Sequence, residues 1–234
     1  MIEFNLYHVT NGIFVNSIKK YGLGGIDPLK KFNLWSLLEE LYSKSEKEIP
    51  NHPIIESYKE ITNLMINQQN FKVKNPLNGK LEKHNFSHGE LYLNANEQRA
   101  ALFAKYHIHG SEILNRILTY LSVFEMEKIK FNYQNICQDL DLKSLMINKP
   151  NTYLIRFKTY DGLKFELEDR DDKEELDSIL KDDIKLKGRI DNPNFNSRLQ
   201  LKTKDVIDVK RLRFFHLKLN PEPDEILDYA LIEK

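Results

Sequence analysis

The side chains that could do chemistry in this chain include its histidines and its single cysteine. Two histidine pairs, His84 with His88 and His107 with His109, have a spacing that could suit a metal ion. A protein metal site needs three or four ligands with supporting partners, and no cysteine cluster or suitably spaced acidic residue completes either pair. We therefore predict no metal site. Cys137 lies in an apolar stretch and is interpreted as a buried, small hydrophobic side chain.

Two short segments carry a more specific pattern. Residues 6–10, Leu-Tyr-His-Val-Thr, place His8 inside an apolar strand that a short helix and a glycine follow. Residues 89–94, Gly-Glu-Leu-Tyr-Leu-Asn, place Tyr92 in a second strand, and a capped helix with several alanines follows it. A lone histidine in a strand is most often structural, so the interpretation depends on the two segments together.

In their order and context the two segments resemble the ADP-ribosyltransferase fold. Members begin with a strand that reads aromatic-His-Gly/Ala-Thr, then a helix and Gly-Leu, here residues 7–10, 13–20 and 22–23. A strand of the type Gly-x-x-Tyr-apolar comes later, followed by a helix with small residues and an aromatic end, here residues 89–93 and 98–104. The resemblance implies an α+β fold of the split β-sandwich type, with a helical insertion after the first strand–helix unit.

The resemblance also implies a substrate and the residues that bind it. In the family the histidine hydrogen-bonds the ribose and the nicotinamide amide of NAD, and the tyrosine stacks on the nicotinamide ring. These roles fall to His8 and Tyr92, which would be both NAD-binding and catalytic. Thr10 and the backbone of Val9 would lie near the nicotinamide. NAD is then a substrate rather than a resident cofactor.

The third position of the family pattern differs in this sequence. Many members open a late strand with a glutamate, because a carboxylate stabilises the positive charge that develops on the ribose as the glycosidic bond breaks. The matching strand begins with Arg198 here. Rifamycin-modifying members take their acid from an earlier hairpin, which would be Glu166 or Glu168. The tRNA 2′-phosphotransferases use basic residues for a phosphate-bearing substrate, which Arg198 would suit. Glu225 in a final strand is another counterpart, and a catalytically inactive relic is the fourth alternative.

Hydrophobic periodicity predicts the elements that would hold these residues. The first half of the chain is predicted to alternate strands and helices: a strand at 2–10, helices at 13–21, 33–48 and 54–68, a loop or irregular hairpin at 69–88, a strand at 90–93, a helix from 97 to 110, and helical character from 111 to about 146. In the second half we predict a hairpin of two strands, an acidic helix and four short strands: 152–158 with 163–168 around Asp161-Gly162, then 169–183, then 198–202, 206–209, 212–218 and 225–232. The prediction is one domain over 1–234, with a helical insert at about 28–85.

Charge balance excludes a protein that coats nucleic acid by bulk charge. The 234 residues hold 35 basic and 35 acidic side chains, so the formal net charge is zero. The zero hides two opposed segments. Residues 166–183 hold ten acidic and three basic side chains, and residues 198–213 hold six basic and two acidic ones. The second segment is a basic strip that could approach a nucleic acid.

The leading hypothesis is an NAD-dependent ADP-ribosyltransferase, an enzyme that cleaves the nicotinamide–ribose bond and modifies a macromolecule, either nucleic acid or protein. Small members of this fold often act as bacterial toxins or in antiviral defence, so an antitoxin or regulatory partner is a further expectation. No signal peptide or membrane span is visible, and a cytoplasmic location without membrane association is expected. The alternative is a catalytically inactive binding protein of the same fold, which fold alone cannot exclude.

Overall fold

The computed structural model describes residues 3–67, 70–74, 81–85, 90–107, 109–147, 151–167, 173–191, 199–219 and 229–233. The chain divides into two compact units that interleave along the sequence. The first unit combines Met1–Ile26, Glu90–Ser111 and Asn151–Lys234, and the second combines Asp27–Gly89 and Glu112–Pro150. The helical segment predicted at about 28–85 falls in the second unit, which also takes in Glu112–Pro150. The organisation as one domain stays a prediction.

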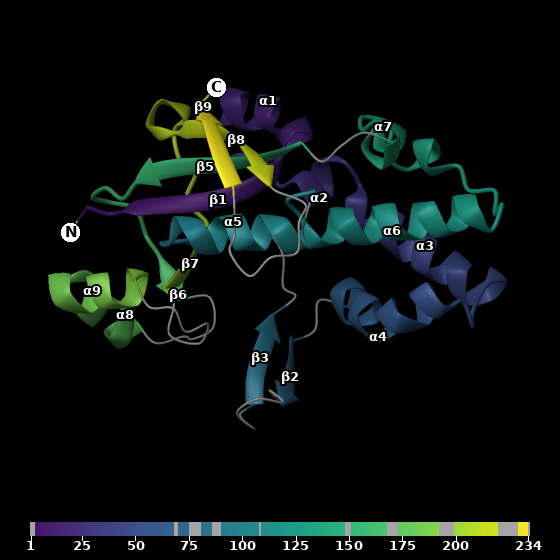
Figure 1. Cartoon of the computed structure of the whole chain (residues 1–234), viewed down its shortest axis with the longest axis horizontal. Helices are drawn as coiled ribbons and strands as arrows, with labels where there is room; N and C mark the ends of the chain where they lie inside the picture. Colours follow the sequence, from purple (N-terminus) through teal and green to yellow (C-terminus); the bar gives the residue numbers. More distant parts are fainter. Residues whose placement is uncertain are drawn as a thin grey trace. The chain divides into compact units, whose positions relative to one another are not determined.

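The first unit is built on seven strands: β1 (Asn5–Asn11), β4 (Leu91–Asn94), β5 (Thr152–Lys158), β6 (Glu166–Leu167), β7 (Gln200–Thr203), β8 (Arg213–Leu219) and β9 (Tyr229–Glu233). They form one antiparallel sheet in the order β6-β7-β4-β1-β5-β8-β9 (Figure 1). β1 lies in the middle and pairs with β5 along its whole length. Its other neighbour, β4, shares one registered pair with it, Tyr7 with Asn94. Helices combined with an antiparallel sheet confirm the predicted α+β class.

Among the described residues, this unit holds four α-helices: α1 (Gly12–Tyr21), α5 (Glu97–Tyr106), α8 (Lys173–Leu180) and α9 (Asp183–Ile190). The side chain of Asn11 caps α1 by accepting a hydrogen bond from the Ile13 amide at 3.0 Å, which satisfies one of the amides that a helix start leaves unpaired. Gly22 ends α1 with a φ of 82°, and a Cβ at this position would lie 2.7 Å from the Ile207 carbonyl oxygen. The turn that follows the first strand–helix unit therefore depends on a glycine.

The helix α5 packs on one face of the sheet through small side chains. Ala100, Ala101 and Ala104 contact a buried cluster of strand residues from β1, β5 and β8: Tyr7, Val9, Leu154, Phe215 and Leu217. Alanine lets the helix backbone approach the sheet closely. Burying such a cluster is the main favourable contribution to folding, at about 25 cal/mol per Å² of apolar surface.

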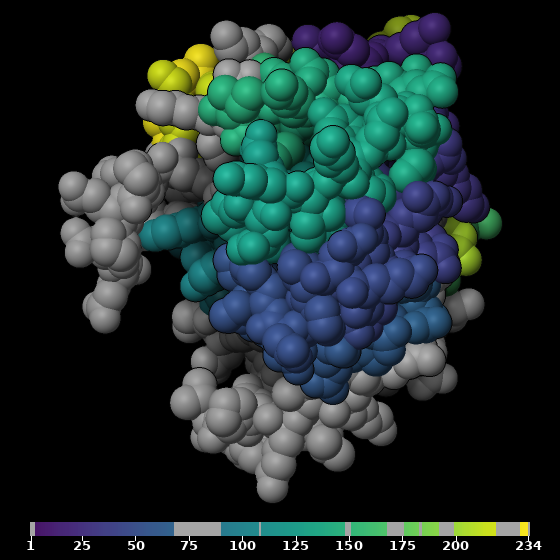
Figure 2. All heavy atoms as spheres, turned by 90° about the vertical axis from the view of Figure 1, so that its right-hand side faces the viewer, coloured from purple at the N-terminus to yellow at the C-terminus, as the bar shows by residue number. Residues whose placement is uncertain are grey.

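The second unit is mostly helical, with α2 (Pro28–Lys31), α3 (Leu34–Glu48), α4 (Pro53–Ile66), α6 (Glu112–Met126), α7 (Leu142–Ile147), the 3-10 turn η1 (Tyr133–Asn135) and the hairpin β2 (Asn70–Lys74) and β3 (Leu81–Asn85). The apolar stripes of α3 and α6 face one another and are almost completely buried: Leu34, Leu37, Leu38, Leu41, Ile113, Leu114, Ile117 and Leu121. Figure 2 shows the blue atoms of α3 and α4 against the teal atoms of α6. In the part of the chain that is described, no helix combines the length and the apolar character that a membrane crossing needs.

Most of the elements predicted from periodicity are confirmed within one to four residues. The strand at 2–10 is β1, and the helices predicted at 13–21, 33–48 and 54–68 are α1, α3 and α4. Asn96 is the cap of α5, because its side-chain oxygen accepts from the Arg99 amide at 3.0 Å. Cys137 is buried, as expected of a small hydrophobic side chain.

Three predicted elements are wrong. The strands around Asp161-Gly162 do not pair with one another, because β5 pairs with β1 and β8 while β6 pairs with β7. Helical character does not continue from 111 to 146, since α6 ends at Met126 and Lys128 takes the left-handed φ of 57°. The predicted strand at 206–209 is a single bridge from Ile207 to Leu23, followed by the 3-10 turn η3 (Val209–Arg211).

Gly110 provides a test of how closely the loop after α5 packs on β1. Its φ is 68°, and a Cβ would lie 2.7 Å from the amide nitrogen of Asn11. We expect Gly110→Ala to lower the free energy of unfolding by about 2–5 kcal/mol, because the left-handed conformation costs about 1–2 kcal/mol and overpacking about 1–3 kcal/mol. Urea unfolding followed by circular dichroism measures this.

Gly188→Ala is the matched control for that substitution. Gly188 lies inside α9 with no heavy atom within 4 Å of its added Cβ, so alanine there is expected to raise the free energy of unfolding by up to about 1 kcal/mol. Equal effects of the two substitutions would contradict the packing described for Gly110.

Candidate functional site

His8 and Tyr92, the two residues predicted to bind NAD, lie on neighbouring strands of the first unit. His8 is on β1 and Tyr92 on β4, and the Nδ1 atom of His8 is 3.0 Å from the main-chain carbonyl oxygen of Tyr92. Eighty-four residues of chain separate the two. The fold thus joins the two segments that the sequence singles out by a direct hydrogen bond.

This bond fixes the protonation of the imidazole ring. A carbonyl oxygen can only accept, so Nδ1 must carry the proton, and Nε2 of the neutral ring is then an acceptor. Burial, which penalises the charged imidazolium, lowers the pKa of His8, and the bond to the Tyr92 carbonyl opposes that shift only in part. His8 is therefore neutral near pH 7, with an acceptor nitrogen that the protein holds in a fixed orientation.

The bond lies where the sheet is joined most weakly. β1 meets β5 over all seven of its residues and meets β4 at Tyr7 alone. Alternation along the strands puts Tyr92 on the face that carries Tyr7 and Val9, and His8 on the opposite face. A ligand that touches both His8 and Tyr92 must therefore lie where β1 and β4 part.

Tyr92 has a charged neighbour in the next strand. Register places Tyr92 opposite Lys202 on β7, and Lys202 opposite Glu166 on β6. The Lys202 Nζ atom is 3.4 Å from the Glu166 carboxylate and 3.2 Å from that of Glu90. Burial alone would lower the pKa of Lys202, but its hydrogen bonds and charge attraction to Glu90 and Glu166 together raise it. Lys202 is charged at neutral pH and holds two carboxylates on the Tyr92 face.

Sequence reasoning missed Glu90 and Lys202 as parts of this arrangement. The signal for Glu90 was available, because it lies two residues before Tyr92 in an extended segment and so shares its face. Lys202 could not be found in this way. Its place beside Tyr92 depends on the pairing of β4 with β7, which local sequence does not specify.

The other predicted site residues have different outcomes. Val9 and Thr10 lie on β1 next to His8, and both side chains are buried. Glu166 opens β6, with its side chain half exposed beside Lys202. Glu168, Arg198 and Glu225 lie outside the described residues. The third catalytic position stays a set of alternatives.

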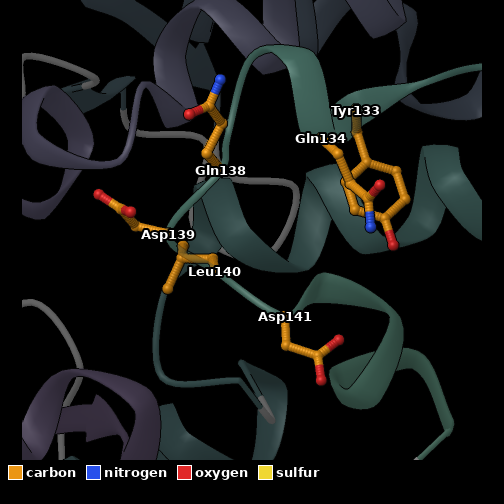
Figure 3. A pocket seen from close by; sticks show the side chains of 6 residues that line it. All are labelled: Tyr133, Gln134, Gln138, Asp139, Leu140 and Asp141. Carbon is orange, nitrogen blue, oxygen red and sulfur yellow. The ribbon is translucent and has the colours of Figure 1, made fainter.

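A separate hollow of about 530 Å³ lies in the second unit. Its lining comes from the stretch between α6 and α7: Tyr133, Gln134, Gln138, Asp139, Leu140 and Asp141 (Figure 3). The Asp139 and Asp141 carboxylates point in different directions. Within the described ranges no group of three or more His, Cys, Asp or Glu side chains could hold a metal ion. The hollow therefore has the polarity of a solvated surface rather than the convergence of a metal site.

Comparison with known proteins found no matching family model, no matching curated protein and no matching solved structure. What bears on function is therefore the chemistry of the residues and the geometry around His8 and Tyr92.

The lowered pKa of His8 predicts a pH dependence of stability. The ordinary pKa of a histidine side chain is about 6.5. Below that pH, His8 binds a proton in the unfolded chain but stays unprotonated in the folded one, because its pKa there is lower. The free energy of unfolding should therefore fall as the pH falls from about 6.5. In His8→Gln this contribution is absent, so the difference in free energy of unfolding between wild type and variant should shrink or reverse toward pH 5.

Urea unfolding at pH 7.5, 6.5 and 5.5 measures that difference. His109, whose pKa burial also lowers, is present in both proteins and cancels in the comparison. Parallel stability curves for wild type and His8→Gln would contradict the neutral state of the half-buried His8.

Proposed function

We propose that this protein is an NAD-dependent ADP-ribosyltransferase, which releases nicotinamide from NAD and transfers ADP-ribose to a macromolecule. The observation that supports the proposal is the 3.0 Å bond between the His8 ring and the Tyr92 carbonyl. It brings together the two motifs whose residues resemble those of the family, at the point where two strands of the sheet part.

His8 would orient the ribose through its free ring nitrogen. Because Nδ1 donates to Tyr92, Nε2 presents a lone pair, which suits the hydroxyl of a ribose as donor. A neutral ring also adds no positive charge near a sugar that becomes positive as its glycosidic bond breaks. The low pKa of His8 therefore fits a group that positions the substrate rather than one that donates a proton.

Tyr92 would supply the surface on which the nicotinamide stacks, and carboxylates on the same face would stabilise the positive charge on the ribose. Glu166 and Glu90 are the described carboxylates nearest to Tyr92 by register, and both are paired with Lys202. Lys202 would hold them in place. Glu168, Arg198 and Glu225 stay alternatives for the third position.

The fold proposed with this function is the split β-sandwich of the ADP-ribosyltransferases. The support for it is the weak join between β1 and β4, which divides the strand order into β6-β7-β4 and β1-β5-β8-β9. In the proposed fold this join is the split, and NAD lies in it against His8, Thr10 and the Val9 backbone. The predicted cytoplasmic location and the regulatory partner stay expectations that accompany the proposal.

A second candidate function is an inactive binding protein on the same scaffold. The observation that favours it is the ion pair of Glu166 with Lys202, because a carboxylate that a lysine neutralises is less able to stabilise a cation. The two candidates differ in one measurable property, the release of nicotinamide.

Incubation of the protein with NAD, alone and with DNA, RNA or cell lysate, tests the proposal by nicotinamide release. We expect release by the wild type, and a loss on the order of 100-fold in kcat/KM for both His8→Ala and Tyr92→Ala, since each removes a group that orients or stabilises the reacting sugar. No release under any condition, together with no rise in melting temperature with NAD, would favour the binding protein.

Matched substitutions show whether these losses belong to the site. Tyr106→Ala removes a 72% exposed tyrosine from α5, and His52→Ala removes a histidine from the second unit. Both should retain nicotinamide release within about twofold. Melting temperatures of all four variants identify any that fail to fold.

The third position is tested by a set of four substitutions: Glu166→Gln, Glu168→Gln, Arg198→Ala and Glu225→Gln. The carboxylate that stabilises the ribose cation should lose about 100-fold or more in kcat with little change in KM, because its contact strengthens only in the transition state. If none of the four lowers kcat, Glu90→Gln becomes the test of the remaining described carboxylate on the Tyr92 face.

A further inference from the structure

We propose that one end of the β5–β8 strand pair binds the phosphate backbone of a nucleic acid. The surface is formed by five cations, here called the basic end: Arg156, Lys158, Lys210, Arg211 and Arg213. The role of this nucleic acid as the ADP-ribose acceptor rests on the proposed function. Its binding to the basic end does not, and can be measured without NAD.

The basic strip read from the sequence at 198–213 divides into two parts in the fold. Lys202 and Lys204 are paired with carboxylates, at 3.2 Å and 3.5 Å from Glu90 and, for Lys202, at 3.4 Å from Glu166. Lys202, with its side chain mostly buried, is therefore largely neutralised, whereas Lys204 is paired through a mostly exposed side chain. Lys210, Arg211 and Arg213 lie beyond β7 and join cations from β5 instead.

Register creates a pair of like charges at the basic end. Arg156 of β5 lies directly opposite Arg213 of β8, and Lys158 follows on the same face of β5. Opposed residues of an antiparallel pair are about 5 Å apart, and like charges so placed destabilise a sheet. Among the described residues, one ion pair reaches this group, Lys158 with Glu3 at 3.7 Å, and both of its side chains are mostly exposed. An anionic ligand would relieve the repulsion.

Two of the guanidinium groups lie over aromatic rings. Arg211 lies 3.9 Å from the centre of the Tyr160 ring, and Arg156 lies 4.8 Å from that of Phe215. Such a cation–π contact restrains a guanidinium, whose N–H groups can still donate hydrogen bonds to a phosphate. Arg211, the last residue of η3, and Arg213, the first residue of β8, flank the buried Leu212, and both arginines are exposed.

The arrangement favours a polymer with a regular series of phosphates over a peptide. Same-face positions along β5 are about 6.8 Å apart, so Arg156 and Lys158 offer cations at regular steps along the strand. A nucleic acid supplies one phosphate per nucleotide regardless of sequence, whereas a peptide would need acidic residues in series. Arg156 also pairs in register with Tyr7, the neighbour of His8, so the bound chain would lie on the same unit as the candidate site.

Fluorescence anisotropy with labelled 20-nucleotide DNA and RNA single strands, and with a DNA duplex, tests the binding at several salt concentrations and without NAD. We expect Arg211→Gln/Arg213→Gln to weaken single-strand binding about tenfold or more. The slope of log K against log[salt] should become shallower by about 1.4, since each phosphate contact on a single strand contributes about 0.7. Arg211→Lys/Arg213→Lys keeps the charge and should restore most of the slope.

The matched control is Lys187→Gln/Lys218→Gln, which makes the same change in net charge at two exposed lysines elsewhere in the first unit. It should leave affinity and slope unchanged, and circular dichroism confirms the fold of each variant. An equal loss in both pairs, or no binding by the wild type, would overturn the proposal. Equal binding of polyglutamate or of phosphatidylserine vesicles would also overturn it, because the surface would then be a general anion binder.

The outcome is independent of the result for NAD. A protein that binds the oligonucleotides through the basic end and releases no nicotinamide contradicts the proposed function and retains this inference. The opposite result is also possible: wild type and Arg211→Gln/Arg213→Gln release nicotinamide equally well and bind the oligonucleotides equally well. That result retains the proposed function and contradicts this inference.

Discussion

The hydrogen bond from the His8 ring to the Tyr92 carbonyl is the interaction on which the arrangement of the first unit depends. It spans the join between β1 and β4, where main-chain register supplies one pair. The same bond sets the tautomer of the ring, which burial keeps neutral, and brings two segments that are far apart in sequence to one place. Structure and candidate chemistry are therefore linked here, because a change that separates the strands also releases the ring.

Charge in this protein is organised by strand register rather than by sequence segment. The basic strip that the sequence presents as one feature becomes two, because Lys202 and Lys204 meet Glu90 and Glu166 across the sheet. The cations left over gather where β5 ends and β8 begins. A zero net charge is thus compatible with a surface on which Arg156 and Arg213 oppose one another.

Features that depend on neighbours in sequence could be predicted, and features that depend on distant pairing could not. The start of α1 follows from Asn11, whose side chain caps the first turn of the helix. The end of α1 follows from Gly22, which has no Cβ and takes a positive φ in the turn after the helix. The turn at Asp161-Gly162 also exists, with a φ of 94° at Gly162. The strand before it, β5, pairs on its two edges with β1 and β8, so it cannot form the predicted hairpin. His8 and Tyr92 were found through local motifs. Lys202 was not, since its position beside Tyr92 comes from the register of β4 with β7.

The central position of β1 has a consequence for synthesis of the chain. The strand that pairs with its whole length, β5, begins only at Thr152 and is therefore synthesised well after β1. At about 5–20 residues per second, a ribosome needs roughly 7–28 seconds to add the residues between them. During that interval β1 has an open edge, and unpaired edges of apolar strands are sites of aggregation. The yield of soluble protein on expression should therefore increase with chaperones that shield a nascent strand, although the overall composition of the chain is balanced.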